Sequence, residues 1–165
     1  MIFSYKLLKE YVDVEGLSIK DITSKLTLAG FELEGIEQLS SGTNLVIGEV
    51  LECVDHPDSD HLHVCQVNIG DKVTQIVCGA PNVRKGLKVI VALPGAELPG
   101  DFVIKASKIR GVESNGMICA LYELGLEEQT EEAYNRGIEE LNSDAPVGTD
   151  PLLYLGLDDT LYELD

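Results

Sequence analysis

Histidine and cysteine side chains alternate in one short segment of this sequence, and both are common metal ligands. His61, His63 and Cys65 stand two positions apart, so a β-strand would project all three from one face. Cys53 and His56 precede them, and zinc accepts imidazole and thiolate ligands. However, the CxxC and HxxxH pairs that are usual in structural zinc sites are absent from the sequence. We therefore predict no bound metal.

The four cysteines are also candidates for disulfide bonds. Each lies in a separate apolar, strand-like run, and none belongs to a CxxC pair; they are Cys53, Cys65, Cys78 and Cys119. Free cysteine behaves as a small hydrophobic residue, and reduced thiols are typical of a reducing compartment. The sequence thus predicts buried reduced thiols, no disulfide and a cytoplasmic location. No uncharged run approaches the length of a membrane span, so we expect no membrane association.

Motifs for nucleophilic or phosphate chemistry are missing. The sequence has no GxSxG nucleophile motif and no GxGxxG dinucleotide motif. The glycine-rich string GAPNVRKG at 79–86 lacks the GxxxxGK[ST] spacing of a phosphate-binding loop. Paired carboxylates are frequent, but only because the chain is acidic. We therefore predict no catalytic site.

The basic residues are concentrated in one part of an acidic chain. The net charge is −17, from 12 basic and 29 acidic residues. Residues 84–110 contain six basic and two acidic side chains, a local charge of +4, which leaves −21 for the rest. The basic ones are Arg84, Lys85, Lys88, Lys105, Lys108 and Arg110. This stretch is either a solvated strand face or a contact surface for nucleic acid.

The string KASKIRGVESNGMICA at 105–120 favours RNA among the possible ligands. Lys105, Lys108 and Arg110 supply charge for phosphate, and Ser114 and Asn115 follow at a turn. The two lysines are three positions apart, so they share a ligand only where the strand curls or bulges. The one aromatic residue close in sequence is Phe102, and aromatic platforms for bases are therefore scarce. We expect phosphate contacts to outweigh base stacking.

The elements that would position these residues change in kind along the chain. Helices are predicted over 5–11, with Ser4 as cap, and from Ser18, with Asp21 at the third helical position, to Gly30. An alternating strand follows, and residues 40–44 read as a polar linker. The chain before this linker is therefore expected to contain two helices and one strand.

After this linker the pattern is that of a small closed barrel. Five strands are expected, followed by a short strand running into a helical turn, an acidic mobile loop, a short helix begun by Asp150 and Pro151, and a last strand that should lie beside residues 31–36. The five barrel strands span 45–54, 62–69, 73–78, 87–93 and 102–109. The strand with its helical turn spans 117–124, the acidic loop 127–132, the short helix 151–155 and the last strand 160–164.

Three long strings resemble the tRNA-binding domain of tRNA ligases and related tRNA-binding proteins. They are HPDSDHLHVCQVNIG (56–70), QIVCGAPNVRKGLKVIVALPGAELPG (75–100) and KASKIRGVESNGMICALYELGL (105–126). The flanks, MIFSYKLLKEYVDVEG, LTLAGFELEGIE (26–37) and GIEELNSDAPVGTDPLLYLGLDDTLYELD (137–165), resemble the start of bacterial phenylalanine–tRNA ligase beta subunits. The resemblance covers essentially the whole chain.

This resemblance implies a mainly β fold with α+β flanks. An OB-fold barrel of residues 40–150 would be inserted in a small split α+β domain of residues 1–39 and 151–165. The chain would be a piece of a longer beta subunit, whose partners are phenylalanine-accepting tRNA and an alpha subunit in a two-alpha, two-beta assembly. That enzyme uses ATP and magnesium. Its ligation and proofreading sites would lie outside this chain, which itself would need no cofactor.

The resemblance also implies a set of RNA-facing residues. Together with the basic stretch, they are Asn82, Arg84, Lys88, Lys105, Lys108, Arg110, Ser114 and Asn115. Two positions depart from the family pattern: His61 replaces a usual lysine or arginine, and Ala120 replaces a common serine. Two other functions stay open. One is an assembly domain of the same subunit with little RNA contact; the other is a free-standing tRNA-binding protein, which the flanks disfavour.

Overall fold

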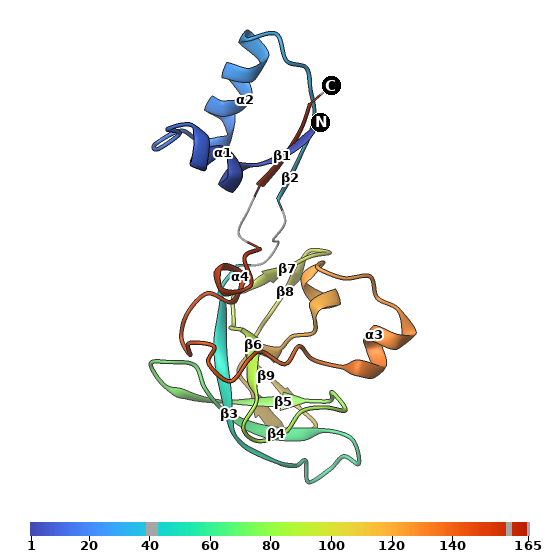
Figure 1. The fold of residues 1–165 in the computed structure, drawn as a ribbon. Helices are drawn as coiled ribbons and strands as arrows, with labels where there is room; N and C mark the ends of the chain where they lie inside the picture. The colour runs from blue at the N-terminus through green and yellow to red at the C-terminus, as the bar shows by residue number, and fades with distance from the viewer. Residues whose placement is uncertain (39–42, 158–159, 165) are drawn as a thin grey trace. The chain divides into compact units, whose positions relative to one another are not determined.

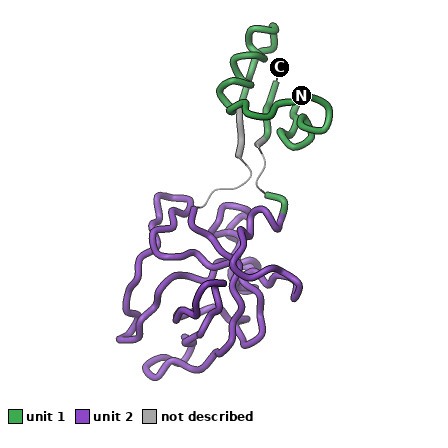
Figure 2. Tube along the Cα trace, turned by 90° about the vertical axis from the view of Figure 1, so that its left-hand side faces the viewer, with its two compact units in different colours: residues 1–40, 156–165 green, residues 41–155 purple. Residues whose placement is uncertain are grey.

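The computed structural model describes residues 1–38, 43–157 and 160–164, and it divides into two compact units (Figures 1 and 2). Unit 1 comprises residues 1–40 and 156–165, so that both ends of the chain belong to it, and unit 2 comprises residues 41–155. The predicted linker at 40–44 lies mostly outside the described residues. None of the described helices has both the length and the apolar character needed to cross a membrane.

Two capped helices form one layer of unit 1. They are α1 (Tyr5–Tyr11) and α2 (Ile19–Leu28). The Ser18 hydroxyl accepts the N–H of Asp21 at 3.2 Å, and the Asp21 carboxylate accepts the N–H of Ser18 at 2.9 Å. This reciprocal pair satisfies two amides that have no partner within the helix. Gly30 follows at φ 94°, a left-handed conformation that suits glycine. The predicted helix signals are confirmed.

The sheet of unit 1 joins segments from opposite ends of the sequence. Its strands are β1 (Ile2–Ser4), β2 (Leu33–Gln38) and β12 (Thr160–Leu164), and the antiparallel order β1-β12-β2 places β12 in the centre. The expected pairing of the last strand with the strand after α2 is confirmed. Tyr162 of β12 is fully buried and its ring stacks on Phe3, with centroids 5.2 Å apart. Val14 and Ile22 complete this small core.

The main sheet of unit 2 is the nearly closed barrel that the sequence predicts. Its antiparallel order is β11-β6-β3-β4-β5. The strands are β3 (Leu45–Asp55), β4 (His63–Asn68), β5 (Val73–Cys78), β6 (Lys88–Ala92) and β11 (Met117–Ile118). Inward-facing branched residues such as Val50, Val67 and Val89 are fully buried between the strands. Both faces of β6 are covered, because Val89 and Val91 lie in this core while Ile90 and Ala92 lie in a second apolar cluster.

The predicted strand over 102–109 is wrong as a single element. The structure divides it into β8 (Phe102–Val103), which pairs with β7 (Glu97–Leu98), and β9 (Ser107–Ile109), which pairs with β10 (Val112–Ser114). Between them Ile104 turns into the core, and its backbone bonds to Gly95 and Ala96 complete the β7–β8 hairpin. The chain then begins a separate hairpin that lies against β5.

The segments after the barrel differ from prediction at two places. A short 3-10 helix, η1 (Leu121–Leu124), follows β11 as expected, but the acidic run is only partly a loop, because α3 (Glu131–Arg136) begins within it. The Thr130 hydroxyl caps α3, and Ala133 is buried beneath it. Helix α4 (Pro151–Tyr154) has the predicted Asp150 cap, yet it belongs to unit 2 because Leu152 and Leu155 pack there. Unit 2 thus ends at Leu155, and the domain bounds expected from the sequence stay a prediction.

Candidate nucleic-acid interface

The β9–β10 hairpin carries Lys108 and Arg110, two exposed cations of the basic stretch, and Lys105 lies just before it. It turns at Arg110 and Gly111, both at positive φ, which is the geometry of a tight two-residue hairpin. Lys105, Lys108 and Arg110 are all exposed. The break before β9 interrupts the regular strand in which the two lysines would point to opposite faces. Within the described part of the chain, Lys105 and Lys108 form no hydrogen bond or ion pair, so their charge is available to a ligand.

A buried histidine fixes this hairpin to the loop after β3. His56 Nδ1 accepts the N–H of Asp58 at 2.9 Å, so the proton of the neutral ring is on Nε2. Nε2 then donates to the carbonyl of Ile109 at 2.9 Å. Arg110 also donates, from Nη1 to the carbonyl of Asp58 at 3.0 Å. The HPDSDHLHV segment therefore positions the basic hairpin.

The other histidines lie apart from each other, and two of the cysteines form a pair. His61 contacts Asp60 at the surface, and His63 faces Asp55. The described ranges contain no group of three or more His, Cys, Asp or Glu residues placed to hold a metal ion. Cys53 and Cys65 face each other with sulfurs 3.8 Å apart and are free thiols.

Asn82, Lys88 and Ser114, three more of the predicted RNA-facing residues, also form side-chain hydrogen bonds inside unit 2. Asn82 donates to the carbonyl of Ile138 at 2.9 Å and accepts its N–H at 3.0 Å. Lys88 donates to the carbonyl of Ala145 at 3.0 Å. Ser114 is buried; its hydroxyl accepts the N–H of Val77 at 3.0 Å and donates to the carbonyl of Gly116. These contacts hold loops against the barrel, and RNA contact by these residues stays a prediction.

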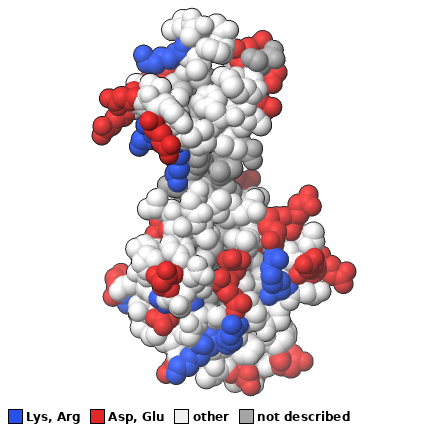
Figure 3. Space-filling model, in the orientation of Figure 1, with Lys and Arg blue, Asp and Glu red and all other residues white. Residues whose placement is uncertain are grey.

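Arg84 and Asn115 complete the predicted set. Arg84 pairs with Glu140 and also donates to the carbonyl of Asn82. Asn115 follows the hairpin, and its N–H donates to the carbonyl of Gln75 at 2.8 Å, which fixes the hairpin to β5. Figure 3 shows a band of Lys and Arg side chains on the visible face of unit 2, with Asp and Glu side chains around it. Acidic residues therefore surround and partly neutralise the basic ones there.

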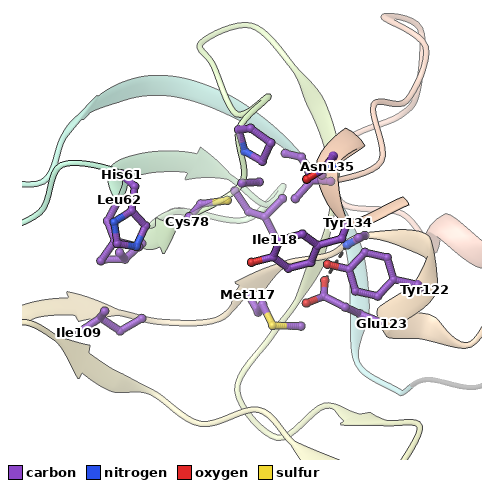
Figure 4. Close-up of a pocket in the computed structure, with 17 residues that line it drawn as sticks. His61, Leu62, Cys78, Ile109, Met117, Ile118, Tyr122, Glu123, Tyr134 and Asn135 are labelled. Atoms are coloured by element: carbon purple, nitrogen blue, oxygen red, sulfur yellow. Dashed lines mark hydrogen bonds between the residues drawn. The ribbon is translucent and has the colours of Figure 1, made fainter. Parts of the chain in front are cut away.

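A cavity of about 580 Å³ opens beside the hairpin, between the end of β5, η1 and α3 (Figure 4). Its floor is apolar and includes Cys78 and Ile118, and Ile109 of β9 belongs to its lining. Two tyrosines, Tyr122 and Tyr134, contribute their rings. The sequence pattern does not reveal these rings, because they lie 20 or more positions after Phe102 and only the fold brings them to the hairpin. These two rings add to Phe102, and the expectation that aromatic platforms are scarce stays a prediction.

One carboxylate lies among these rings. Glu123 Oε2 accepts the N–H of Ala120 at 2.7 Å, and Figure 4 shows the carboxylate beside Tyr122 and Tyr134. Burial raises the pKa of Glu123 above 4.5, and the bond from Ala120 only partly offsets this. Burial also raises the pKa of Tyr122 and brings the pKa of Cys78 to about 11. Cys78 is therefore a neutral thiol at neutral pH and a poor nucleophile.

Comparison with known proteins places this site in a family. Residues 45–150 match the family described as "Putative tRNA binding domain". The match covers unit 2 almost completely, including the basic hairpin and the cavity beside it. The chain therefore belongs to the tRNA-binding-domain family.

Similarity to individual proteins extends beyond this domain. The chain is 50% identical to the phenylalanine–tRNA ligase beta subunit of Geobacillus kaustophilus, over 99% of this chain and 21% of that protein. It is 49% identical to that of Streptococcus pneumoniae, over 99% and 20%. A solved structure of a methionyl-tRNA-synthetase-related protein from Pyrococcus horikoshii covers 64% of this chain and 85% of its own, with 22% identity and a TM-score of 0.47. The chain thus spans about a fifth of the curated beta subunits it matches.

Proposed function

We propose that this chain is a non-catalytic tRNA-binding part of a phenylalanine–tRNA ligase beta subunit. Family membership gives the class of ligand. The observation that carries the proposal is the pair of exposed lysines, Lys108 on a hairpin held by His56 and Lys105 just before that hairpin. Phosphate contacts supply most of the affinity of such a surface, because each one releases counterions from the RNA. The lysines would contact the tRNA backbone, and Arg110 and Asn115 would extend the surface along the hairpin.

The whole protein would act with an alpha subunit, in a two-alpha, two-beta assembly, to join phenylalanine to its tRNA. ATP and magnesium would serve that reaction at a centre outside the residues of this chain, and the enzyme would act in the cytoplasm. The support is the roughly 50% identity to beta subunits of that name. The chain alone should then release no amino acid from charged tRNA and attach none.

Binding of a phenylalanine-accepting tRNA transcript tests the RNA contact. The variant Lys105→Ala/Lys108→Ala should bind more weakly than the wild type at low salt. Its log affinity should also depend less on log salt, by about 0.7–0.9 for each phosphate that the variant no longer neutralises. The control Lys20→Ala/Lys25→Ala changes the net charge equally, and both of its exposed lysines belong to unit 1. Equally weakened binding in both variants would reduce the effect to overall charge. Absence of binding by the wild type would favour the assembly-domain function.

A further inference from the structure

We propose that the cavity between β5, η1 and α3 binds one unstacked nucleobase of the RNA, with preference for a base that carries an exocyclic amino group. This inference rests on the proposed function and adds base recognition to it. The cavity volume of about 580 Å³ is within the range of small-ligand sites and exceeds what one base requires. Ile109 of β9 belongs to its lining and is the neighbour in sequence of Lys108 and Arg110, so the basic hairpin adjoins the cavity.

The chemistry of the walls fits a planar aromatic ligand. Tyr134 is 63% exposed although its ring borders an apolar cavity, so it offers a face on which a base can stack. Tyr122 is half-buried beside it, and the apolar floor of Cys78 and Ile118 would cover the inner edge of the base. A free phosphate or a charged sugar would gain nothing from such a floor. An aromatic ring with polar edges would.

Glu123 supplies the selectivity. An ionised carboxylate only accepts hydrogen bonds, and one oxygen of Glu123 already accepts the N–H of Ala120, which fixes its direction. The ligand must therefore donate. Adenine, cytosine and guanine have an amino group for this purpose, whereas uracil presents one N–H between two carbonyl oxygens that the carboxylate repels. The cavity should accordingly favour amino-bearing bases over uracil.

Two measurements test this site with the chain as it stands. The first is affinity for the tRNA transcript as a function of salt. Tyr134→Ala should weaken binding by about 5- to 150-fold, the range for removal of one base–aromatic stack. It should leave the salt dependence unchanged, because every phosphate contact is retained. Tyr11→Ala removes a tyrosine that is also exposed but lies in unit 1, and it should have no effect.

The second measurement compares the hexamers rA6, rC6 and rU6. The wild type should prefer rA6 and rC6 to rU6, and Glu123→Gln should reduce that preference, because an amide both donates and accepts. Glutamine keeps an oxygen for the N–H of Ala120, so the fold is retained. If both variants bind tRNA and hexamers like the wild type while the lysine variant binds more weakly, the base site is refuted and the proposed function stands. If the wild type binds no RNA at low salt, both fail.

Discussion

At the scale of single residues, several side chains that the sequence assigned to RNA have a structural partner. Asn82 is the clearest case, because its side-chain NH2 donates to the carbonyl of Ile138 and its side-chain oxygen accepts the N–H of Ile138. The sequence shows that the Asn82 side chain is polar. It does not show that the fold places the backbone of a residue 56 positions away against that side chain. His56 shows the same limit, since its role depends on Ile109, which is 53 positions away.

Asn82→Ala should lower the free energy of unfolding of unit 2 by about 2–3 kcal/mol, because two partly buried backbone groups of Ile138 would have no partner. Denaturant titration measures this change. Asn115→Ala is the matched control: its backbone N–H, which bonds to Gln75, is retained, so its effect should stay within about 0.5 kcal/mol. Equal effects of the two changes would contradict the structural role of Asn82.

The raised pKa of Glu123 predicts a pH-dependent stability. Below about pH 4.5 the carboxyl group is protonated in both states; as pH rises, the unfolded chain releases its proton first, so ionisation favours unfolding. Glu123→Gln removes this effect. The melting temperature of the variant relative to the wild type should therefore increase from about pH 4 to about pH 7. A difference that is the same at both pH values would show that burial does not shift this carboxyl group.

At the scale of elements, the sequence predicts a helix or strand correctly where neighbouring residues supply the stabilising contact. The caps at Ser4, Ser18 and Asp150 and four of the five barrel strands have the predicted positions. The predictions failed where a distant contact decides the structure. The expected fifth strand is interrupted at Ile104, because the backbone of Ile104 is hydrogen-bonded to Gly95 and Ala96. Part of the acidic run is helical in α3, because Ala133 of that helix is buried in the core.

Helix α3 should depend on its cap. Thr130→Ala removes the hydroxyl that accepts the N–H of Ala133, which should cost the helix about 1 kcal/mol and speed amide exchange over residues 133–136. Thr130→Ser keeps the hydroxyl and should exchange like the wild type. Because α3 carries Tyr134, the alanine variant should also bind tRNA more weakly than the serine variant. Identical exchange in both variants would show that the cap does not hold the helix.

At the scale of the whole molecule, the position of the charges matters more than their sum. A net charge of −17 disfavours RNA in general. Exposed acids are screened over about 8 Å at physiological salt, so a local basic surface still contacts phosphate while the rest of the chain lowers its affinity. Binding should thus be weak and sensitive to salt. Unit 1 takes strands from both ends of the chain, and the tRNA-binding family match lies wholly in unit 2.

The proposed function and the base site together require that tRNA contacts unit 2 at the β9–β10 hairpin and the cavity beside it. Titration of the ¹⁵N-labelled chain with the tRNA transcript at low salt, followed by amide chemical shifts, locates the contact residue by residue. We expect the largest changes over residues 105–117 and around Tyr122 and Tyr134, with unit 1 little affected. Changes confined to unit 1, with none over residues 105–117 or around Tyr122 and Tyr134, would contradict this location.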